Sequence, residues 1–239
     1  MAKASLLSVK QLTFLIVKRK FYSIKMPIRR PIPMRETKWA IAIAKQLKNI
    51  GMRPNQISIL SVVFSGLSGA CLVIASRISS GWHIPLLISS GVFIQLRLLC
   101  NMLDGMVAIE GGLKTKTGEL FNELPDRISD VLILVGAGYS IKCMECGVEL
   151  GWLAAVLSVL TAYVRALGGA IGAAQYFSGP MAKQHRMHIM TASCLITALE
   201  VALGRVEYVM TFALGIIAIG CVITVIRRVC YIVKDLETK

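Results

Sequence analysis

Asparagine and aspartate side chains recur at helical spacing in two neighbouring segments of this chain. They are Asn101 and Asp104 in the first segment, and Asn122, Asp126 and Asp130 in the second. Residues three or four apart share one face of a helix, so each segment would present a row of oxygen atoms on one side. Carboxylate and amide oxygens fixed on helices suit a hard divalent cation such as Mg²⁺. Phosphate and water usually supply the remaining ligands of such an ion. These residues therefore predict a metal site that handles a phosphorylated compound.

Small residues accompany both rows of oxygen atoms. Gly105, Ala108 and Gly118 would let a flat or phosphorylated group approach the backbone closely. The alternative is that the polar residues only hold helices together, which is a common role of a single asparagine inside a bundle. The number of acids and amides in matching turns favours the metal site over this alternative.

The two segments belong to a series of six apolar stretches. These stretches lie near residues 55–76, 84–104, 120–142, 149–174, 186–204 and 208–232. Most provide the roughly 20 residues that a helix needs to cross the hydrocarbon core, and none alternates like a barrel strand. We therefore predict an all-α membrane protein with six transmembrane helices. A charge at the bilayer centre costs about 2.5–3.5 kcal/mol, so the acids must face one another in a shared polar cavity.

Composition supports a membrane protein. The chain has 239 residues, of which 55% are hydrophobic and 17% are charged, against roughly 25% charged in soluble domains. These values argue against a soluble globular domain and against a disordered chain. The formal net charge is +14, and in so apolar a protein this favours contact with anionic membrane lipids over nucleic acid.

The positive charge is concentrated at the start of the chain. Residues 1–53 contain 13 Lys or Arg and one acid, Glu36. The proline-containing stretch 26–34 reads as a linker, and Trp39, Ile43 and Leu47 then recur at helical spacing. We predict an interfacial amphipathic helix there, with packing on the rest of the protein as the alternative. The predicted organisation is a basic segment (1–53), a six-helix membrane domain (54–233) and a polar tail (234–239). Basic residues in the loops place both termini and the polar site on the cytoplasmic or matrix side.

The two polar segments resemble a known signature. The signature has two parts, D-x-x-D-G-x-x-A-R and, after eight or nine residues, G-x-x-x-D-x-x-x-D. The first part is similar to Asn101-Met-Leu-Asp104-Gly105-Met-Val-Ala108 in this chain. The second part is similar to Gly118-Glu-Leu-Phe-Asn122-Glu-Leu-Pro-Asp126. This two-part signature is that of the CDP-alcohol phosphatidyltransferases, and the resemblance extends over roughly residues 53–233. It implies six membrane helices, usually preceded by an amphipathic helix, and a homodimer. This chain departs from the signature at Asn101, Asn122 and Ile109, as in a divergent bacterial branch of the family.

The resemblance also implies residue roles. In the family, four acids hold two divalent ions around the CDP pyrophosphate, and the fourth acid activates the acceptor hydroxyl. The metal ligands would then be Asn101, Asp104, Asn122 and Asp126. Asp126 would also be the catalytic base, and Asp104, Gly105, Ala108 and Gly118 would contact the nucleotide. With two acids missing, we predict one firmly bound Mg²⁺ or Mn²⁺ and a second that arrives with substrate. Glu123 is a candidate substitute ligand.

A second group of candidate residues is basic. Arg165, Lys183 and Arg186 lie near the inner ends of the fourth and fifth apolar stretches, and we predict that they hold a phosphate on the acceptor. The alternative is the ordinary excess of basic residues in inner loops. Cys143 and Cys146 form a lone C-x-x-C with no partner pair, so they do not predict a metal site.

Together these patterns predict a membrane transferase of phospholipid biosynthesis. It would move a phosphatidyl group from a CDP-activated lipid, most simply CDP-diacylglycerol, to a hydroxyl on a small or lipid alcohol, with release of CMP. The acceptor is not identified by the sequence. The alternative is a catalytically silent membrane protein on the same scaffold that binds CDP-lipid or regulates a neighbour, because two motif acids are missing.

Overall fold

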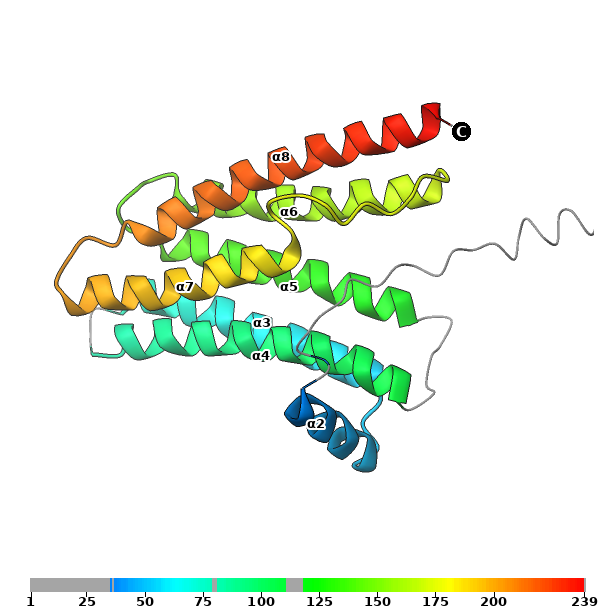
Figure 1. Ribbon diagram of the computed structural model, residues 1–239. Coiled ribbons are helices and arrows are strands. Elements are labelled where there is room, and N and C mark those ends of the chain that lie inside the picture. Colours follow the sequence, from blue (N-terminus) through cyan, green and yellow to red (C-terminus); the bar gives the residue numbers. More distant parts are fainter. Residues whose placement is uncertain (1–34, 36, 79–80, 111–117, 239) are drawn as a thin grey trace, which may run out of the picture. The chain divides into compact units, whose positions relative to one another are not determined.

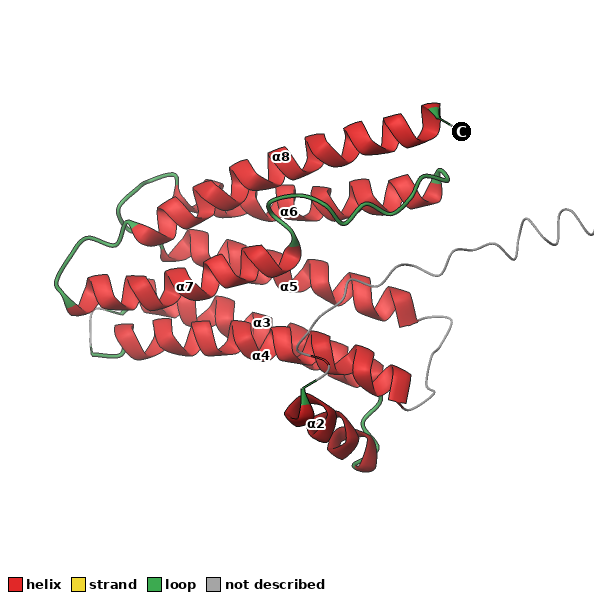
Figure 2. Ribbon diagram, viewed as in Figure 1, coloured by secondary structure: helices red, strands yellow, loops and turns green. Residues whose placement is uncertain are grey.

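The computed structural model describes Arg35 and residues 37–78, 81–110 and 118–238. The predicted linker and most of the basic amino-terminal segment lie outside this part. The described residues form seven helices and no strand (Figure 2). The helices are α2 (Lys38–Asn49), α3 (Pro54–Arg77), α4 (His83–Glu110), α5 (Gly118–Ser140), α6 (Gly147–Ala170), α7 (Lys183–Ala202) and α8 (Val209–Glu237). The all-α prediction is confirmed for the described part.

The six longer helices form a bundle in which successive helices run in opposite directions (Figure 1). Helix α3 packs on α4 and α5, α6 packs on α5 and α8, and α7 packs on α4 and α8. A core of Leu, Ile, Met and Ala side chains fills the space between them, with Leu72, Ile133 and Leu214 fully buried. The segment between α6 and α7 runs back along the bundle before α7 begins, so α7 starts away from the end of α6 (Figure 1).

Four of the described helices are long and apolar enough to cross a membrane, namely α3, α4, α6 and α8. Helices α5 and α7 match the third and fifth predicted stretches in position but contain more polar residues. The amino-terminal half of α5 alone includes Glu123, Asp126, Arg127 and Asp130. The prediction of helices long and apolar enough to span is therefore confirmed for four helices, and a total of six spanning helices stays a prediction.

Helix α2 forms where the sequence predicts an amphipathic helix. Ala40 and Ala44 are fully buried against residues of α4 and Ile57 of α3, whereas Trp39 is 44% exposed. The face that packs on the bundle is thus the alanine face, because small side chains allow the closest approach between helices. The larger apolar residues Trp39 and Ile50 remain exposed, and their position in a membrane interface stays a prediction.

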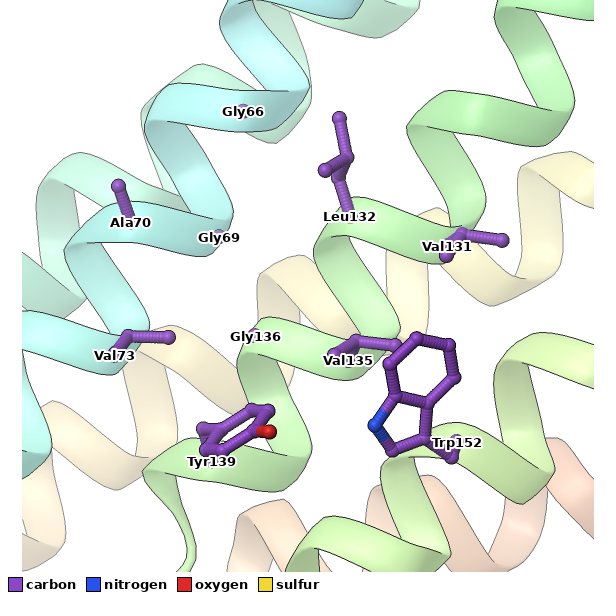
Figure 3. Close-up of a pocket in the computed structure, with 10 residues that line it drawn as sticks. All are labelled: Gly66, Gly69, Ala70, Val73, Val131, Leu132, Val135, Gly136, Tyr139 and Trp152. Carbon is purple, nitrogen blue, oxygen red and sulfur yellow. The ribbon is translucent and has the colours of Figure 1, made fainter.

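Two glycines set the closest contact between α3 and α5. A Cβ atom on Gly136 would lie 2.6 Å from Gly69 Cα, and one on Gly69 would lie 2.5 Å from the Leu132 carbonyl oxygen. Figure 3 shows both glycines beside a shallow apolar pocket, which is also lined by Val73, Tyr139 and Trp152. The pocket contains none of the candidate site residues. The glycines let α5 approach α3 and so bring its acids close to α4.

This contact gives a stability prediction. Gly136→Ala should lower the free energy of unfolding by about 1–3 kcal/mol, because the added methyl group meets backbone that cannot move aside alone. Thermal unfolding of the purified protein in detergent measures the change. Gly215→Ala in α8 is the matched control, since nothing lies within 4 Å of its Cβ position. An equal effect of both substitutions would contradict the role assigned to the α3–α5 contact.

Candidate functional site

The candidate site lies at the end of the bundle where α4 and α6 finish and α3 and α5 begin (Figure 1). Asp104 of α4 is 3% exposed, and its Oδ2 accepts a hydrogen bond of 2.7 Å from Ser58 Oγ of α3. Its Oδ1 is buried without a hydrogen-bond partner. Asp104 thus keeps one free carboxylate oxygen while Ser58 fixes the other.

Asp126 of α5 has a similar arrangement. Its Oδ2 accepts a hydrogen bond from Lys183 Nζ of α7, and its Oδ1 is buried without a hydrogen-bond partner. Arg97 Nη2 lies 3.6 Å from that Oδ1 and donates a hydrogen bond of 3.3 Å to the Asp126 carbonyl oxygen. The charge of Asp126 acts on Asp104, as does that of Lys183. The two predicted acids are therefore brought together, each with one free oxygen.

A third acid, Asp130, lies one helical turn deeper and has no exposed surface. Its Oδ1 accepts a hydrogen bond of 2.8 Å from Arg97 Nη2, and its Oδ2 accepts one of 2.5 Å from Arg186 Nη2. Arg186 also donates to the Met181 carbonyl oxygen at 2.8 Å. Asp130 thus joins α4, α5 and α7 directly behind Asp126.

The two asparagines of the motif differ in their surroundings. Asn101 is partly buried, and its Nδ2 has no hydrogen-bond partner. Asn122 is exposed. Among the predicted nucleotide contacts, Gly105 is buried, whereas Ala108 and Gly118 are partly buried. A Cβ on Gly105 would lie 3.2 Å from Nη2 of Arg35, so the glycine makes room for a further cation at this end of the bundle.

Glu123, the predicted substitute ligand, lies in a different ion pair. Its Oε2 accepts hydrogen bonds from Arg127 and, at 2.5 Å, from Arg165 Nη2 of α6. The Arg165 guanidinium also lies 4.9 Å from the centre of the Phe177 ring. Two arginines therefore already neutralise Glu123, which makes it a weaker candidate ligand than Asp104 or Asp126.

Each predicted anion-binding residue pairs with one acid of α5. Arg165 pairs with Glu123, Lys183 with Asp126 and Arg186 with Asp130. Lys183 keeps 26% of its side chain exposed, whereas Arg186 keeps 2% of its side chain exposed. The predicted contact with an acceptor phosphate is therefore more accessible to Lys183 than to Arg186, and for all three residues it stays a prediction.

The residues fit a single divalent cation. In the described part no cluster of three His, Cys, Asp or Glu side chains could hold a metal ion. The free Oδ1 atoms of Asp104 and Asp126 are nevertheless buried acceptors with no donor, and a buried carboxylate oxygen needs a cation or a donor. Water, phosphate and the amide oxygen of Asn101 could complete the coordination of a hard ion.

Sequence reasoning assigned no role to Ser58 or Arg97, and it placed Asp130 in the polar row of the metal site rather than in an ion pair with two arginines. Arg97 lies four residues before Asn101, and Asp130 lies four after Asp126, so both continue the polar faces by one turn. That spacing, in stretches where a charge is costly, was the available signal. The Ser58 contact with Asp104 had no such signal because it joins residues 46 positions apart.

The Ser58 contact gives a prediction for metal binding. Ser58→Ala should weaken Mn²⁺ binding by about tenfold, because residues that orient a ligand typically contribute 10–100-fold to metal affinity. Isothermal titration calorimetry of the purified protein with MnCl₂ measures this. Ser76→Ala is the matched control, since the Ser76 hydroxyl bonds only to the Val73 carbonyl oxygen of its own helix. Unchanged Mn²⁺ affinity in Ser58→Ala would argue against Asp104 as a ligand.

Comparison with known proteins gives relatives at low sequence identity, and no protein-family profile matches the chain. An uncharacterized protein of Aquifex aeolicus is 28% identical over 188 residues, which cover 78% of this chain and 85% of the relative. A phosphatidylinositol phosphate synthase of Streptomyces avermitilis is 23% identical over 191 residues, which cover 77% of this chain and 74% of the synthase. The inner membrane protein YnbA of Escherichia coli is 28% identical over 132 residues, which cover 55% of this chain and 61% of YnbA. Together with the four apolar helices, this similarity supports a multi-pass membrane protein.

Crystal structures of phosphatidylinositol phosphate synthase from Mycobacterium tuberculosis have the same fold. The synthase with CDP-DAG bound matches with a TM-score of 0.69 at 20% identity, over 82% of this chain and 94% of the synthase. The same synthase in complex with manganese and citrate matches with a TM-score of 0.69 at 21% identity, over 81% and 88% of the two chains. These similarities in sequence and in fold confirm that the chain resembles the CDP-alcohol phosphatidyltransferase family.

Proposed function

We propose that this chain is a CDP-alcohol phosphatidyltransferase, which moves a phosphatidyl group from CDP-diacylglycerol to an acceptor hydroxyl and releases CMP. The observation that carries the proposal is the pair of buried carboxylates, Asp104 and Asp126, each with one oxygen free at the same end of a membrane bundle. The related M. tuberculosis synthase, solved with CDP-DAG and with manganese, supports this choice of donor and of a divalent metal. The product would be a phospholipid.

Asp104 and Asp126 would hold the metal ion, Mg²⁺ or Mn²⁺, with the amide oxygens of Asn101 and Asn122 as further ligands. When bound, the ion polarises the pyrophosphate and neutralises charge on the departing CMP. Ser58 orients Asp104, since its hydroxyl occupies one oxygen and leaves the other for the site. Ala108 and Gly118 leave space for the nucleotide beside the backbone, and at Gly105 the nucleotide would meet Arg35, whose Nη2 lies 3.2 Å from the position of a Cβ there.

Asp126 is the general base of the proposed reaction. Its free Oδ1 accepts the proton of the acceptor hydroxyl, and the hydroxyl oxygen forms a bond to the phosphorus that bears the lipid. The bond between that phosphorus and the CMP oxygen breaks, and CMP leaves with the electron pair. For this step the hydroxyl must approach within about 2.6–3.2 Å of the carboxylate. Arg97 and Lys183 keep the carboxylate in position through the contacts at its two oxygens.

The proposed membrane arrangement follows the charge of the chain. All six long helices span the membrane, and α2 lies at its surface with Trp39 toward the lipid headgroups and its lysines toward anionic lipid. Both termini and the site lie on the cytoplasmic or matrix side. A membrane-embedded site suits a donor with an apolar and a charged end, and the proposed assembly is a homodimer. Gly168 and Gly172 provide only weak support for the dimer.

The proposed acceptor is an alcohol that carries a phosphate. Lys183 is partly exposed beside Asp126, and Arg165 and Arg186 add positive charge close by. A phosphate on the acceptor would meet these residues while its hydroxyl faces Asp126. Glycerol phosphate and inositol phosphate are the alcohols to test first, and serine and a second lipid serve as comparisons that lack a phosphate monoester.

The test is release of CMP by the purified chain in detergent. The assay contains CDP-diacylglycerol, Mg²⁺ or Mn²⁺, and each acceptor in turn, with a chelator as the negative control. We expect metal-dependent CMP release that rises with one acceptor. No CMP release with any acceptor, in protein that still binds CDP-diacylglycerol, would instead favour the silent lipid-binding protein.

A further inference from the structure

In the described part, Lys183 donates a hydrogen bond to the carboxylate of the proposed base, whereas Arg97 forms only a longer ion pair of 3.6 Å with it. Its ammonium lies on Asp126 Oδ2, while Asp126 Oδ1 has no hydrogen-bond partner. Lys183 is also the first residue of α7, whose first turn contains no acid. A positive charge is unfavourable at a helix amino terminus because the backbone N–H groups there carry partial positive charge. The ion pair with Asp126 therefore offsets an otherwise unfavourable position.

The side chains that are directly linked to this pair have balanced charges. Six side chains meet through ion pairs or act on one another here, three of them acids and three of them cations. They are Asp104, Asp126, Asp130, Arg97, Lys183 and Arg186. These six side chains have no net charge among themselves, and Arg127, which acts on Asp130, and Arg35, beside Gly105, add positive charge around them. One divalent ion would therefore leave an excess of at least two positive charges. A diphosphate diester, with about two negative charges, would compensate that ion, whereas a second ion would leave uncompensated charge in a poorly solvated place.

We propose that Lys183 is a built-in cation of the metal site, which takes the place of a second metal ion on Asp126 and so limits the site to one divalent ion. The inference rests on the proposed function only in placing a divalent ion at Asp104 and Asp126. Lys183 occupies Oδ2, so Oδ1 of Asp126 is left to hold the ion together with Oδ1 of Asp104, and the second lone pair of Asp126 Oδ1 remains for the acceptor hydroxyl. The positive charge of Lys183 compensates the negative charge of Asp126, and it also repels a second metal ion.

The test compares Mn²⁺ binding to the full chain and its variants in detergent, without lipid, by calorimetry and by the electron paramagnetic resonance of free Mn²⁺. Wild type should bind one Mn²⁺ per chain. Lys183→Met removes the charge but keeps the length, and should bind Mn²⁺ at least about tenfold more tightly because the repulsion is gone. Lys183→Arg keeps the charge and should bind like wild type. Lys234→Met, on an exposed residue of α8, controls for the loss of any lysine.

Three results would overturn the inference. They are two Mn²⁺ ions per wild-type chain, no Mn²⁺ binding by any variant, and equal affinity in Lys183→Met and wild type. Lys183→Gln provides a second neutral variant if Lys183→Met does not fold, as judged by its thermal transition. A failure of the proposed function can be distinguished from a failure of this inference. In the first case wild type would release no CMP, while the Mn²⁺ affinities of the variants would still follow the charge at position 183.

Discussion

Asp126→Asn should lower the rate of CMP release by at least about 100-fold, because general bases typically contribute 10²–10⁴-fold and an amide cannot accept the proton. The substitution keeps the shape of the side chain and its place beside Lys183 and Arg97. The rate constant at saturating donor and acceptor should fall while binding of CDP-diacylglycerol persists. Initial rates of CMP release, with donor binding measured separately, test both parts of the prediction.

A matched control separates chemistry from loss of charge. Glu145→Gln removes an acid from the exposed loop between α5 and α6, at the far end of α5 from Asp126, and should leave the rate unchanged. Asp126→Asn protein must also show a cooperative thermal transition, since the substitution leaves Lys183 without its carboxylate. More than about a tenth of the wild-type rate in folded Asp126→Asn would contradict the assignment of the base.

The helices were predictable because apolar stretches and their breaks are local features of the sequence. The stretch predicted at 55–76 forms helix Pro54–Arg77, which starts at a proline as helices often do. The convergence of Asp104 and Asp126 was also predictable. Each acid continues a polar face at helical spacing. Charged side chains on apolar helices face the interior of the bundle and pair with one another, because exposure to lipid is costly.

The pairings of the charges could not be predicted, because they depend on the path of a loop. The segment between α6 and α7 turns back along the bundle, and this return brings Lys183 to Asp126 and Arg186 to Asp130 (Figure 1). In the sequence these pairs are 57 and 56 residues apart, and nothing local sets their register. The three basic residues near the inner ends of the fourth and fifth stretches therefore looked open to a ligand, whereas each is paired with an acid of α5.

These pairings also change the charge balance of the site. From the motif alone, Asp104 and Asp126 would just compensate two divalent ions together with a doubly charged diphosphate. Arg97, Lys183 and Arg186 bring three positive charges to the same end of the bundle, and Asp130 brings one negative charge. The site is therefore less negative than its motif implies, and it favours one ion over two.

Asp130→Asn should be the most destabilising substitution in this cluster, with a loss of about 3–5 kcal/mol of unfolding free energy or a failure to fold. Asp130 is fully buried and accepts hydrogen bonds from two arginines that are themselves buried. An asparagine would leave Arg186 without a counter-charge inside the bundle, and Arg97 with only its longer contact of 3.6 Å to Asp126. The midpoint of thermal unfolding in detergent, compared with wild type, measures the loss.

Two further variants identify the cause of that loss. Arg97→Met should cost less than Asp130→Asn, because the pair between Asp130 and Arg186 remains. Glu123→Gln removes an acid that also bridges two arginines, but this side chain is 50% exposed, so its loss should cost no more than about 1 kcal/mol. If Asp130→Asn were no more destabilising than Glu123→Gln, the buried charges would not need Asp130, and water or another group must reach Arg97 and Arg186.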